Sequence, residues 1–234
     1  MMKTIGLLGG AGWSSTISYY TLLNQQVNAR LGGDHSAKIL LRSIDFHDIM
    51  SHFGKDNQKV EEALHDELLG LIAIQPDCII ICCNLLHKYY DLIEHSLESD
   101  IPVMHAIDLT AQQLQQKNYH KVLLLASTFT MEDGFFENTL SQNGISVIVP
   151  NQEERERIGQ IHQELLHNKV TRESRAYFSD LTLKYKSLDA VVLGCTELPM
   201  VLDQANSSLP IVDPVVLQVV HAVDFALESL DSRQ

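Results

Sequence analysis

The 234-residue sequence predicts an α/β protein built on parallel sheets. Short apolar segments rich in β-branched residues alternate with longer segments that carry apolar residues at three- and four-residue spacing, which is the order of buried strands and covering helices. The short segments are apolar almost throughout, as are strands whose sheet is covered on both faces. A third observation is an internal repeat, because three of these segments recur in the same order in the second half.

The alternation defines each expected element in turn. Buried strands are expected at residues 4–8, 38–43, 78–82, 102–104, 122–126, 146–149, 190–193 and 210–212. Covering helices are expected at residues 15–31, 57–74, 106–117, 131–143, 153–167, 172–186 and 215–230, where the apolar spacing is helical. No Pro- or Ser-rich linker interrupts the order, so a tight crossing near residues 104–109 is the expected domain boundary.

The repeat predicts two pseudo-symmetric parallel-sheet α/β domains that arose by internal duplication. The matching segments are 5–10, 79–84 and 101–104 in the first half, and 122–127, 191–196 and 209–212 in the second. The expected domains are residues 1–105, with a C-terminal helix at 213–234 packing back on them, and residues 106–212. Because ligands bind beyond the carboxyl ends of parallel strands, the active site is expected in the crevice between the domains.

Charge and hydropathy exclude several classes of protein. Thirty acidic residues against 17 basic ones give a formal net charge of −13, which predicts no nucleic-acid partner and no anionic membrane surface. No apolar run approaches the roughly 18 to 20 residues that cross a bilayer. The first residues lead into a strand rather than a signal peptide, so a cytoplasmic location is expected.

The four cysteines do not form a pattern typical of disulfides or of structural zinc. Cys78, Cys82 and Cys83 crowd one segment, while Cys195 lies far downstream. A structural zinc site requires paired Cys-x-x-Cys or Cys/His ligands, and this spacing supplies none, so no metal is expected. Cys78 and Cys82 alternate with apolar neighbours and are interpreted as core residues.

Cys83 and Cys195 occupy equivalent places in the two repeats. Each follows the third strand, precedes a small polar residue and is expected at the N-terminus of a helix, where the dipole and unpaired N–H groups favour a thiolate. Inert core cysteines are the alternative, but the repeated context favours catalysis. Two thiols in one crevice suit a two-base racemase, in which one thiolate removes the α-proton of an amino acid and the opposite thiol returns one.

Such a reaction needs hydrogen-bond donors for the substrate carboxylate. Polar residues near strand ends that suit this role are Asn84, Ser127, Thr130 and Thr196. Asn84 and Thr196 could instead cap helices. Glu197 is either a first-turn acid favoured by the helix dipole or a group that tunes the Cys195 thiol. His87 lies one helical turn from Cys83, and a catalytic role and a structural one are equally open.

The glycine-rich start is expected to bind an anion. Gly10, Ala11 and their neighbours form a tight turn between a strand and a capped helix, whose N–H groups could hold a carboxylate. As a dinucleotide fingerprint the segment is poor, because no second strand supplies an acidic residue about 20 positions on. The loop is therefore interpreted as a carboxylate-binding wall of the crevice.

The sequence resembles the cofactor-independent aspartate/glutamate racemase family over nearly its whole length. The residues that carry the resemblance are the segments 2–10, 31–37, 45–46, 83–88, 129–132, 173–175 and 194–199. The cysteine motifs Cys83-Asn84-Leu85-Leu86-His87-Lys88 and Gly194-Cys195-Thr196-Glu197-Leu198-Pro199 are the specific ones. The resemblance implies racemisation without pyridoxal phosphate or metal, a homodimer, and Cys83 and Cys195 as the acid/base pair.

The resemblance also implies which residues lie near the substrate, and the chain departs from the family at other positions nearby. Asn84, Ser127, Thr130 and Thr196 correspond to groups near the substrate carboxylate. Leu85 stands where the family usually has Thr, and Phe53 lies where relatives often have a polar residue. These changes remove polar groups near the pocket.

The predicted function is therefore a cofactor-independent racemase that interconverts L- and D-aspartate or glutamate, with a less polar amino acid as an alternative substrate. Two further alternatives remain. One is a hydrolase, isomerase or decarboxylase that uses one cysteine as a nucleophile, and the other is an amino-acid-binding homologue without turnover.

Overall fold

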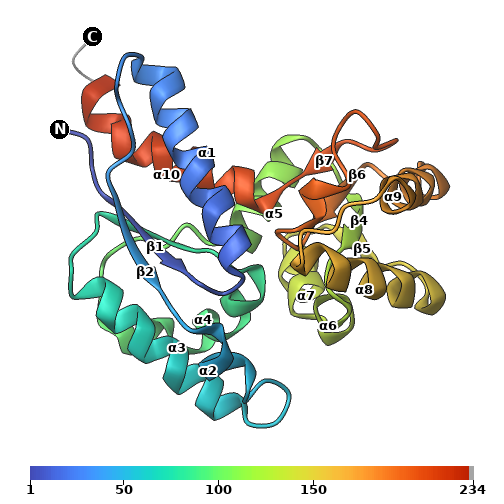
Figure 1. Cartoon of the computed structure of the whole chain (residues 1–234), viewed down its shortest axis with the longest axis horizontal. Coiled ribbons are helices and arrows are strands. Elements are labelled where there is room, and N and C mark those ends of the chain that lie inside the picture. Colours follow the sequence, from blue (N-terminus) through green and yellow to red (C-terminus); the bar gives the residue numbers. More distant parts are fainter. Residues whose placement is uncertain (232–234) are drawn as a thin grey trace. The chain divides into compact units, whose positions relative to one another are not determined.

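A computed structural model describes residues 1–231 and has the expected α/β architecture (Figure 1). The chain divides into two compact units. The first comprises Met1–Ala106 together with the C-terminal segment from Val215, and the second comprises Ile107–Pro214. Residues 232–234, the last three of the expected C-terminal helix, lie outside the described residues. Among the helices of residues 1–231, none has both the length and the apolar character that membrane crossing requires.

The first unit is built on a three-stranded parallel sheet in the order β2-β1-β3. Its strands are β1 (Ile5–Gly9), β2 (Ile39–Ser43) and β3 (Cys78–Ile81). Its helices are α1 (Trp13–Leu31), α2 (Phe46–Met50), α3 (Asn57–Ile72), α4 (His87–Ile93) and α10 (Pro214–Asp231), with the 3₁₀ helices η1 (Asn84–Leu86) and η2 (Glu94–Leu97). Strands β1 and β3 are buried at every position, as their unbroken apolar sequences predict.

Two hydrophobic clusters cover the sheet of the first unit. One unites Leu7 and Ile80 with buried residues of α1 and α10, so the last helix of the chain completes the core of the first unit. Figure 1 shows α1 and α10 side by side, in blue and red. The other cluster unites Leu8 and Ile81 with buried residues of α3 and α4. Successive strand residues thus point to opposite cores.

The second unit is built on a four-stranded parallel sheet in the order β5-β4-β6-β7. Its strands are β4 (Lys121–Leu125), β5 (Ser146–Ile148), β6 (Ala190–Leu193) and β7 (Ile211–Val212). Its helices are α6 (Thr128–Asp133), α7 (Phe135–Gln142), α8 (Gln152–Leu166) and α9 (Arg172–Lys184), with the 3₁₀ helix η3 (Leu198–Met200). Helix α5 (Ala106–Gln116) leads from the first unit into this one.

The two sheets repeat one another down to single hydrogen bonds. The N–H of Cys82 donates to the carbonyl of Leu8 over 2.9 Å, and the N–H of Gly194 donates to the carbonyl of Leu125 over 2.7 Å. These bonds end equivalent ladders, β3 on β1 and β6 on β4. The next residues in the chain, Cys83 and Cys195, are therefore structurally equivalent.

The structure differs from the predicted elements at three places. Residues 102–104 form no strand, because only Val103 bridges Ile79, where β7 pairs over two residues in the second unit. The helix expected at 131–143 is two helices, α6 and α7, because Gly134 interrupts it with φ of 86°. Helix α2 was not expected, since it is only five residues long, and the helix expected directly after Cys83 begins as the 3₁₀ helix η1 and continues as α4.

Candidate active site

Cys83 lies at the carboxyl end of β3. Its backbone is extended, with φ of −153° and ψ of 114°, and it occupies the N-cap position of the three-residue helix η1. The side chain is partly exposed, whereas Cys82 before it is fully buried. The turn from strand to 3₁₀ helix therefore leaves the second of two adjacent thiols partly exposed at the edge of the hydrophobic cluster.

Asn84 follows as the first residue of η1. Only 3% of it is exposed, and both polar atoms of its amide are buried without a hydrogen-bond partner in the described structure. A buried amide without partners costs about 1 to 3 kcal/mol, so such a group points to a ligand that supplies the missing partners. The alternative role of Asn84 as a helix cap is not observed, because its side chain makes no hydrogen bond to the backbone of η1.

Cys195 lies at the carboxyl end of β6 and directly follows Gly194. A Cβ atom at Gly194 would lie 3.0 Å from Ala126 Cβ, so a glycine suits the close approach of these strand ends. The Cys195 side chain is partly exposed, like that of Cys83.

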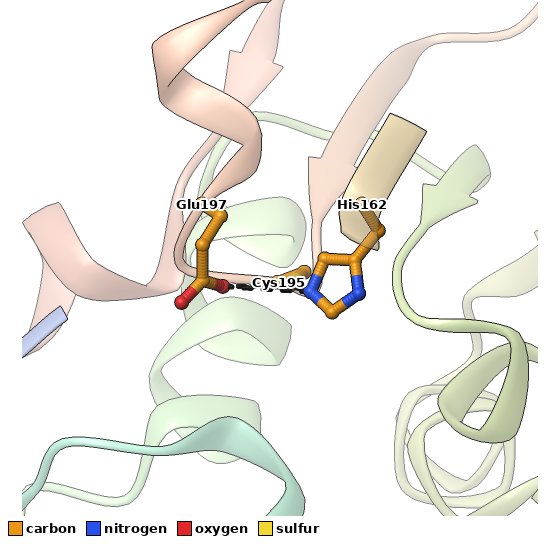
Figure 2. A group of neighbouring side chains, drawn as sticks. All are labelled: His162, Cys195 and Glu197. Carbon is orange, nitrogen blue, oxygen red and sulfur yellow. Dashed lines mark hydrogen bonds and ion pairs between the residues drawn. The ribbon is translucent and has the colours of Figure 1, made fainter. Parts of the chain in front are cut away.

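Cys195 Sγ, His162 Nε2 and Glu197 Oε2 converge at one point (Figure 2). Cys195 Sγ lies 3.0 Å from His162 Nε2 and 3.0 Å from Glu197 Oε2. The imidazole and carboxylate are 3.7 Å apart. Both are largely buried, with 14% and 7% of their side chains exposed. We call these three residues the Cys195 cluster.

The proton positions in the Cys195 cluster follow from Glu197. Burial raises the pKa of the Glu197 carboxyl, but hydrogen bonds from His162, Cys195 and Thr196 outweigh it, so the pKa lies below its ordinary value. The carboxylate is ionised at neutral pH and can only accept hydrogen bonds. The Cys195 thiol and the Thr196 hydroxyl therefore donate to it. With its proton directed at Glu197, the sulfur can accept from the His162 N–H.

Helix α8 positions His162. Its first turn is fixed by a capping box, in which Asn151 Oδ1 accepts from the N–H of Glu154 and Glu154 Oε2 accepts from the N–H of Asn151. The buried residues Ile161 and Leu165 hold the helix on the second unit. A Cβ atom at Gly159 would lie 2.8 Å from Thr128 Oγ1, so this glycine lets α8 approach α6 closely one turn before His162.

Ser127 and Thr130 share one site at the carboxyl end of β4. Ser127 caps α6 by accepting from the N–H of Thr130 over 3.3 Å, and the two hydroxyls are 2.9 Å apart. Thr130 is buried and Ser127 is partly exposed. One hydroxyl of the pair donates to the other, so the second hydroxyl can donate a hydrogen bond to a ligand.

The glycine loop follows β1 in the first unit. Gly10 has φ of 93°, and a Cβ atom there would lie 2.2 Å from the carbonyl oxygen of Ile44, so only glycine fits. Its N–H already donates to Thr16 Oγ1 over 2.8 Å. Ala11 beside it is buried. The loop packs against Ile44, the residue after β2, rather than presenting the Gly10 N–H to a ligand.

Leu85 and Phe53 have different surroundings in the first unit. Leu85 is partly exposed in η1. Phe53 packs edge-on against Tyr89, with ring centroids 5.5 Å apart, and joins the hydrophobic cluster under α3 and α4. Phe53 therefore contributes to the core of the first unit.

His87 is structural rather than catalytic. It is fully buried, and burial together with neighbouring His105 lowers its pKa to about 3, so it is neutral. Gln218 Nε2 donates to Met104 O over 2.6 Å and lies 3.4 Å from His87 Nε2, so that ring nitrogen accepts. His87 Nδ1 then carries the proton and donates to Cys83 O over 3.1 Å.

The two remaining cysteines are core residues, as predicted. Burial, with Asp77 nearby, raises the pKa of the Cys78 thiol to about 12. Burial raises the pKa of the Cys82 thiol well above its ordinary value. Both are inert as acids or bases at neutral pH.

The expected helix N-terminus is observed after Cys83 and only partly after Cys195. The 3₁₀ helix η1 after Cys83 continues directly into α4, whereas Cys195 precedes a turn and then the three-residue helix η3. A helix as short as η3 carries little of the macrodipole that a full helix has. At Cys195 the neighbouring imidazole and carboxylate, rather than a dipole, are the dominant electrostatic groups.

Neither His162 nor Gln218 was predicted from the sequence. His162 is 33 residues from Cys195 along the chain, so no spacing rule connects the two. Gln218 offered a signal, since it is a polar residue within the apolar face of α10 formed by Val215, Val219 and Ala222. Its amide also accepts from the hydroxyl of Tyr19 over 2.5 Å.

Comparison with known proteins shows the family. The model of the Asp/Glu/Hydantoin racemase family matches residues 8–222. A crystal structure named for a candidate Asp/Glu racemase from Yersinia pestis is 36% identical, with 97% of this chain and all of that chain covered and a TM-score of 0.87.

Two further relatives agree. The structure of an aspartate racemase homologue from Pyrococcus horikoshii is 25% identical, with 96% of this chain and 99% of that chain covered and a TM-score of 0.83. The broad specificity amino-acid racemase RacX of Bacillus subtilis is 24% identical over 159 residues, 68% of either chain. The fold and these matches define a racemase of the isomerase class. The chain belongs to the Asp/Glu/Hydantoin racemase family.

Proposed function

We propose that this protein racemises an amino acid without a cofactor, that aspartate or glutamate is the substrate, and that Cys83 and Cys195 are the two acid/base groups. The observation that carries the proposal is the equivalence of the two thiols, each one residue beyond the last ladder bond of its sheet. The reaction requires the two thiols to reach opposite faces of one α-carbon. Residues 1–105 with the C-terminal helix, and residues 106–212, would be the two domains that supply them.

The Cys195 cluster suits the acid half of the reaction. A thiol that donates to an ionised carboxylate holds its proton, and it can deliver that proton to a planar carbanion. The thiolate left behind would accept a hydrogen bond from His162, which lies 3.0 Å away. In the reverse direction the thiolate removes a proton, and the same two neighbours hold the regenerated thiol.

The α-carboxylate is proposed to be bound by local N–H and hydroxyl groups, which must act against the chain's net charge of −13. Asn84 offers a buried amide whose hydrogen-bonding capacity is unused. Ser127 and Thr130 are the other proposed donors, and Thr196, whose hydroxyl proton is directed at Glu197, is proposed to line the site beside them. Gly10, Ala11 and Leu85 are proposed to line the same substrate site.

A less polar substrate is the second candidate. Leu85 directly follows Asn84 and is partly exposed, so an apolar surface adjoins the proposed carboxylate donor. The name of the relative RacX describes broad specificity, which also favours a wider set of amino acids. A cytoplasmic homodimer remains a prediction from the sequence.

The test is isotope exchange in D2O with the full chain and single enantiomers of aspartate, glutamate and a panel of apolar amino acids. We expect α-proton exchange, read by NMR, together with inversion, read by chiral chromatography. Cys83→Ser and Cys195→Ser should each lower the inversion rate by about 100- to 10,000-fold. Each variant should retain exchange of only the enantiomer whose α-proton faces the remaining thiol.

Cys78→Ala is the matched control, because it removes an inert buried thiol from the start of β3 and should keep full activity. Absence of exchange for every amino acid would contradict the racemase. A covalent adduct on one thiol, detected by mass spectrometry, would favour a nucleophilic enzyme instead. Binding without exchange would favour a binding protein.

A further inference from the structure

The Cys195 cluster brings together three different kinds of metal ligand. One thiol sulfur, one imidazole nitrogen and one carboxylate oxygen lie within 4.8 Å of one another, and Figure 2 shows that all three side chains point at the same space. The spacing of the cysteines along the chain predicts no zinc site. That prediction could not include His162, which lies on α8, 33 residues before Cys195.

We propose that the Cys195 cluster binds one Zn²⁺ ion, and that this ion is a reversible inhibitor rather than a cofactor. The inhibitory part rests on the proposed function, because it requires Cys195 to be an acid/base group. The binding part rests on the ligand geometry alone.

The separations of the donor atoms are close to those of a zinc site. Tetrahedral zinc, with bonds of about 2.0 Å to N or O and about 2.3 Å to S, keeps its ligand atoms about 3.3 to 3.5 Å apart. The separations here are 3.0, 3.0 and 3.7 Å. Adjustments of about half an ångström, within the reach of small side-chain rotations, convert the hydrogen-bonded cluster into a coordination set.

The chemistry of the ligands selects zinc among common cations. Calcium and magnesium prefer sets made only of oxygen ligands, whereas sulfur and imidazole nitrogen suit zinc. A thiolate and a carboxylate balance the two charges of the ion, which favours binding where His162 and Glu197 are largely buried. Three protein ligands leave a fourth position for water or for a ligand atom of a substrate.

Binding exchanges a proton for the metal without any redox change. The S–H bond of Cys195 breaks, the proton goes to solvent, and a sulfur–zinc bond forms. The sulfur then has no proton to deliver, and because it shares electron density with zinc it is a much weaker base toward an α-proton. Zinc and racemisation therefore exclude one another at this thiol.

Co²⁺ is the probe for the binding test, because its thiolate complexes absorb in the near ultraviolet. Co²⁺ is added to the reduced, EDTA-treated full chain at neutral pH, and Zn²⁺ is then used to displace it. We expect one equivalent of Co²⁺ to produce the thiolate charge-transfer band and one equivalent of Zn²⁺ to remove it. Cys195→Ser should abolish the band, and His162→Ala should weaken Zn²⁺ binding at least about 100-fold.

His167→Ala is the matched control, because His167 is exposed at the end of the same helix and should not affect the band. No band at one equivalent, or the same band in Cys195→Ser, would overturn the site, as would unchanged Zn²⁺ affinity in His162→Ala. In the wild-type chain, Zn²⁺ should stop inversion and leave exchange of only the enantiomer whose α-proton faces Cys83, as in Cys195→Ser, and EDTA should restore inversion. Inversion that continues with zinc bound would overturn the inhibition, whereas zinc binding to a chain that racemises no amino acid would contradict only the proposed function.

Discussion

Asn84 stands out among the described residues because both polar atoms of its amide are buried without a partner. Folding must remove this amide from water and recovers no hydrogen bond for it, which costs about 1 to 3 kcal/mol. The adjacent thiol, Cys83, is held by a backbone that His87 fixes through the Cys83 carbonyl. An amide that lowers the stability of the free protein, beside a thiol whose backbone is fixed, is expected in a site that is selected for binding a ligand rather than for stability.

Asn84→Ala should therefore separate stability from activity. Loss of a donor to a charged carboxylate should reduce kcat/KM by about 10- to 100-fold, which corresponds to about 1.5 to 3 kcal/mol. The free energy of unfolding should remain within about 1 kcal/mol of wild type or increase, because no hydrogen bond in the free protein is lost. Steady-state kinetics and urea unfolding measure the two quantities.

Asn57→Ala is the control for this substitution. Asn57 is exposed, and its Oδ1 accepts from the Tyr89 hydroxyl over 3.1 Å, so its amide is used in the free protein. This variant should lose about 0.5 to 1.5 kcal/mol of stability and keep its kcat/KM. If Asn84→Ala is the less stable variant and retains full activity, the interpretation of Asn84 as a ligand donor is wrong.

At the scale of elements, α10 and η1 are connected through a buried polar chain. Tyr19 donates to Gln218 Oε1, Gln218 Nε2 donates toward His87 Nε2, and His87 donates to the carbonyl of Cys83. The chain operates only while His87 is neutral, since a protonated ring could not accept from Gln218. The position of η1 is therefore linked to the protonation of a residue outside the proposed chemistry.

This link predicts a pH dependence of folding. Burial and neighbouring His105 lower the pKa of His87 from 6.5 to about 3, so the unfolded chain binds a proton there that the folded chain does not. Above pH 6.5 neither the folded nor the unfolded chain binds this proton, and the free energy of unfolding is at its full value. As the pH falls from 6.5 toward 3, only the unfolded chain binds it, and the free energy of unfolding decreases. Stability should fall by about 1.4 kcal/mol per pH unit in this range because of His87 alone.

His87→Gln should remove this contribution, and the difference between wild type and variant isolates it from carboxyl titration. Urea unfolding across the range gives the two slopes. His95→Gln is the control, because the His95 side chain is 97% exposed and should leave the slope unchanged. Equal slopes in wild type and His87→Gln would show that His87 is protonated in the folded protein.

The predictability of the elements depended on their physical origin. Strands such as Ala190–Leu193 were predicted to the residue, because a run of four apolar residues that ends at a glycine is typical of a buried parallel strand. The short helix Phe46–Met50 was missed because five residues are too few to show a helical apolar period. The break at Gly134 was missed because a glycine within a helical pattern is often tolerated.

The candidate site could be predicted from the sequence only in part. Both thiols and the residues after them could be identified, since the repeat marks them at corresponding positions. The partners of Cys195 could be identified only in part. Glu197 is two residues away, but His162 reaches the thiol through the packing of α8, which depends on Gly159 and on the whole second unit. Local sequence cannot reveal that contact.

At the scale of the whole molecule, the first unit is discontinuous. The chain completes the second unit at Pro214 and then contributes α10 to the first. Six buried apolar residues of α10 belong to one core with β1 and α1: Val215, Val219, Ala222, Val223, Ala226 and Leu227. The first unit therefore cannot complete its core until the end of the chain is available.

A charged residue in that part of α10 should unfold one unit and spare the other. Val223→Asp introduces a carboxylate at a position with 0% exposure and should cost at least about 3 kcal/mol. Val216→Asp, on the same helix at a position with 42% exposure, should stay within about 0.5 kcal/mol of wild type. In hydrogen exchange measured by mass spectrometry, Val223→Asp should lose protection in β1 and β3 while β4 and β6 stay protected. Equal loss of protection in both sheets would mean that the two units fold as one, and loss confined to α10 would mean that the first unit holds its core without it.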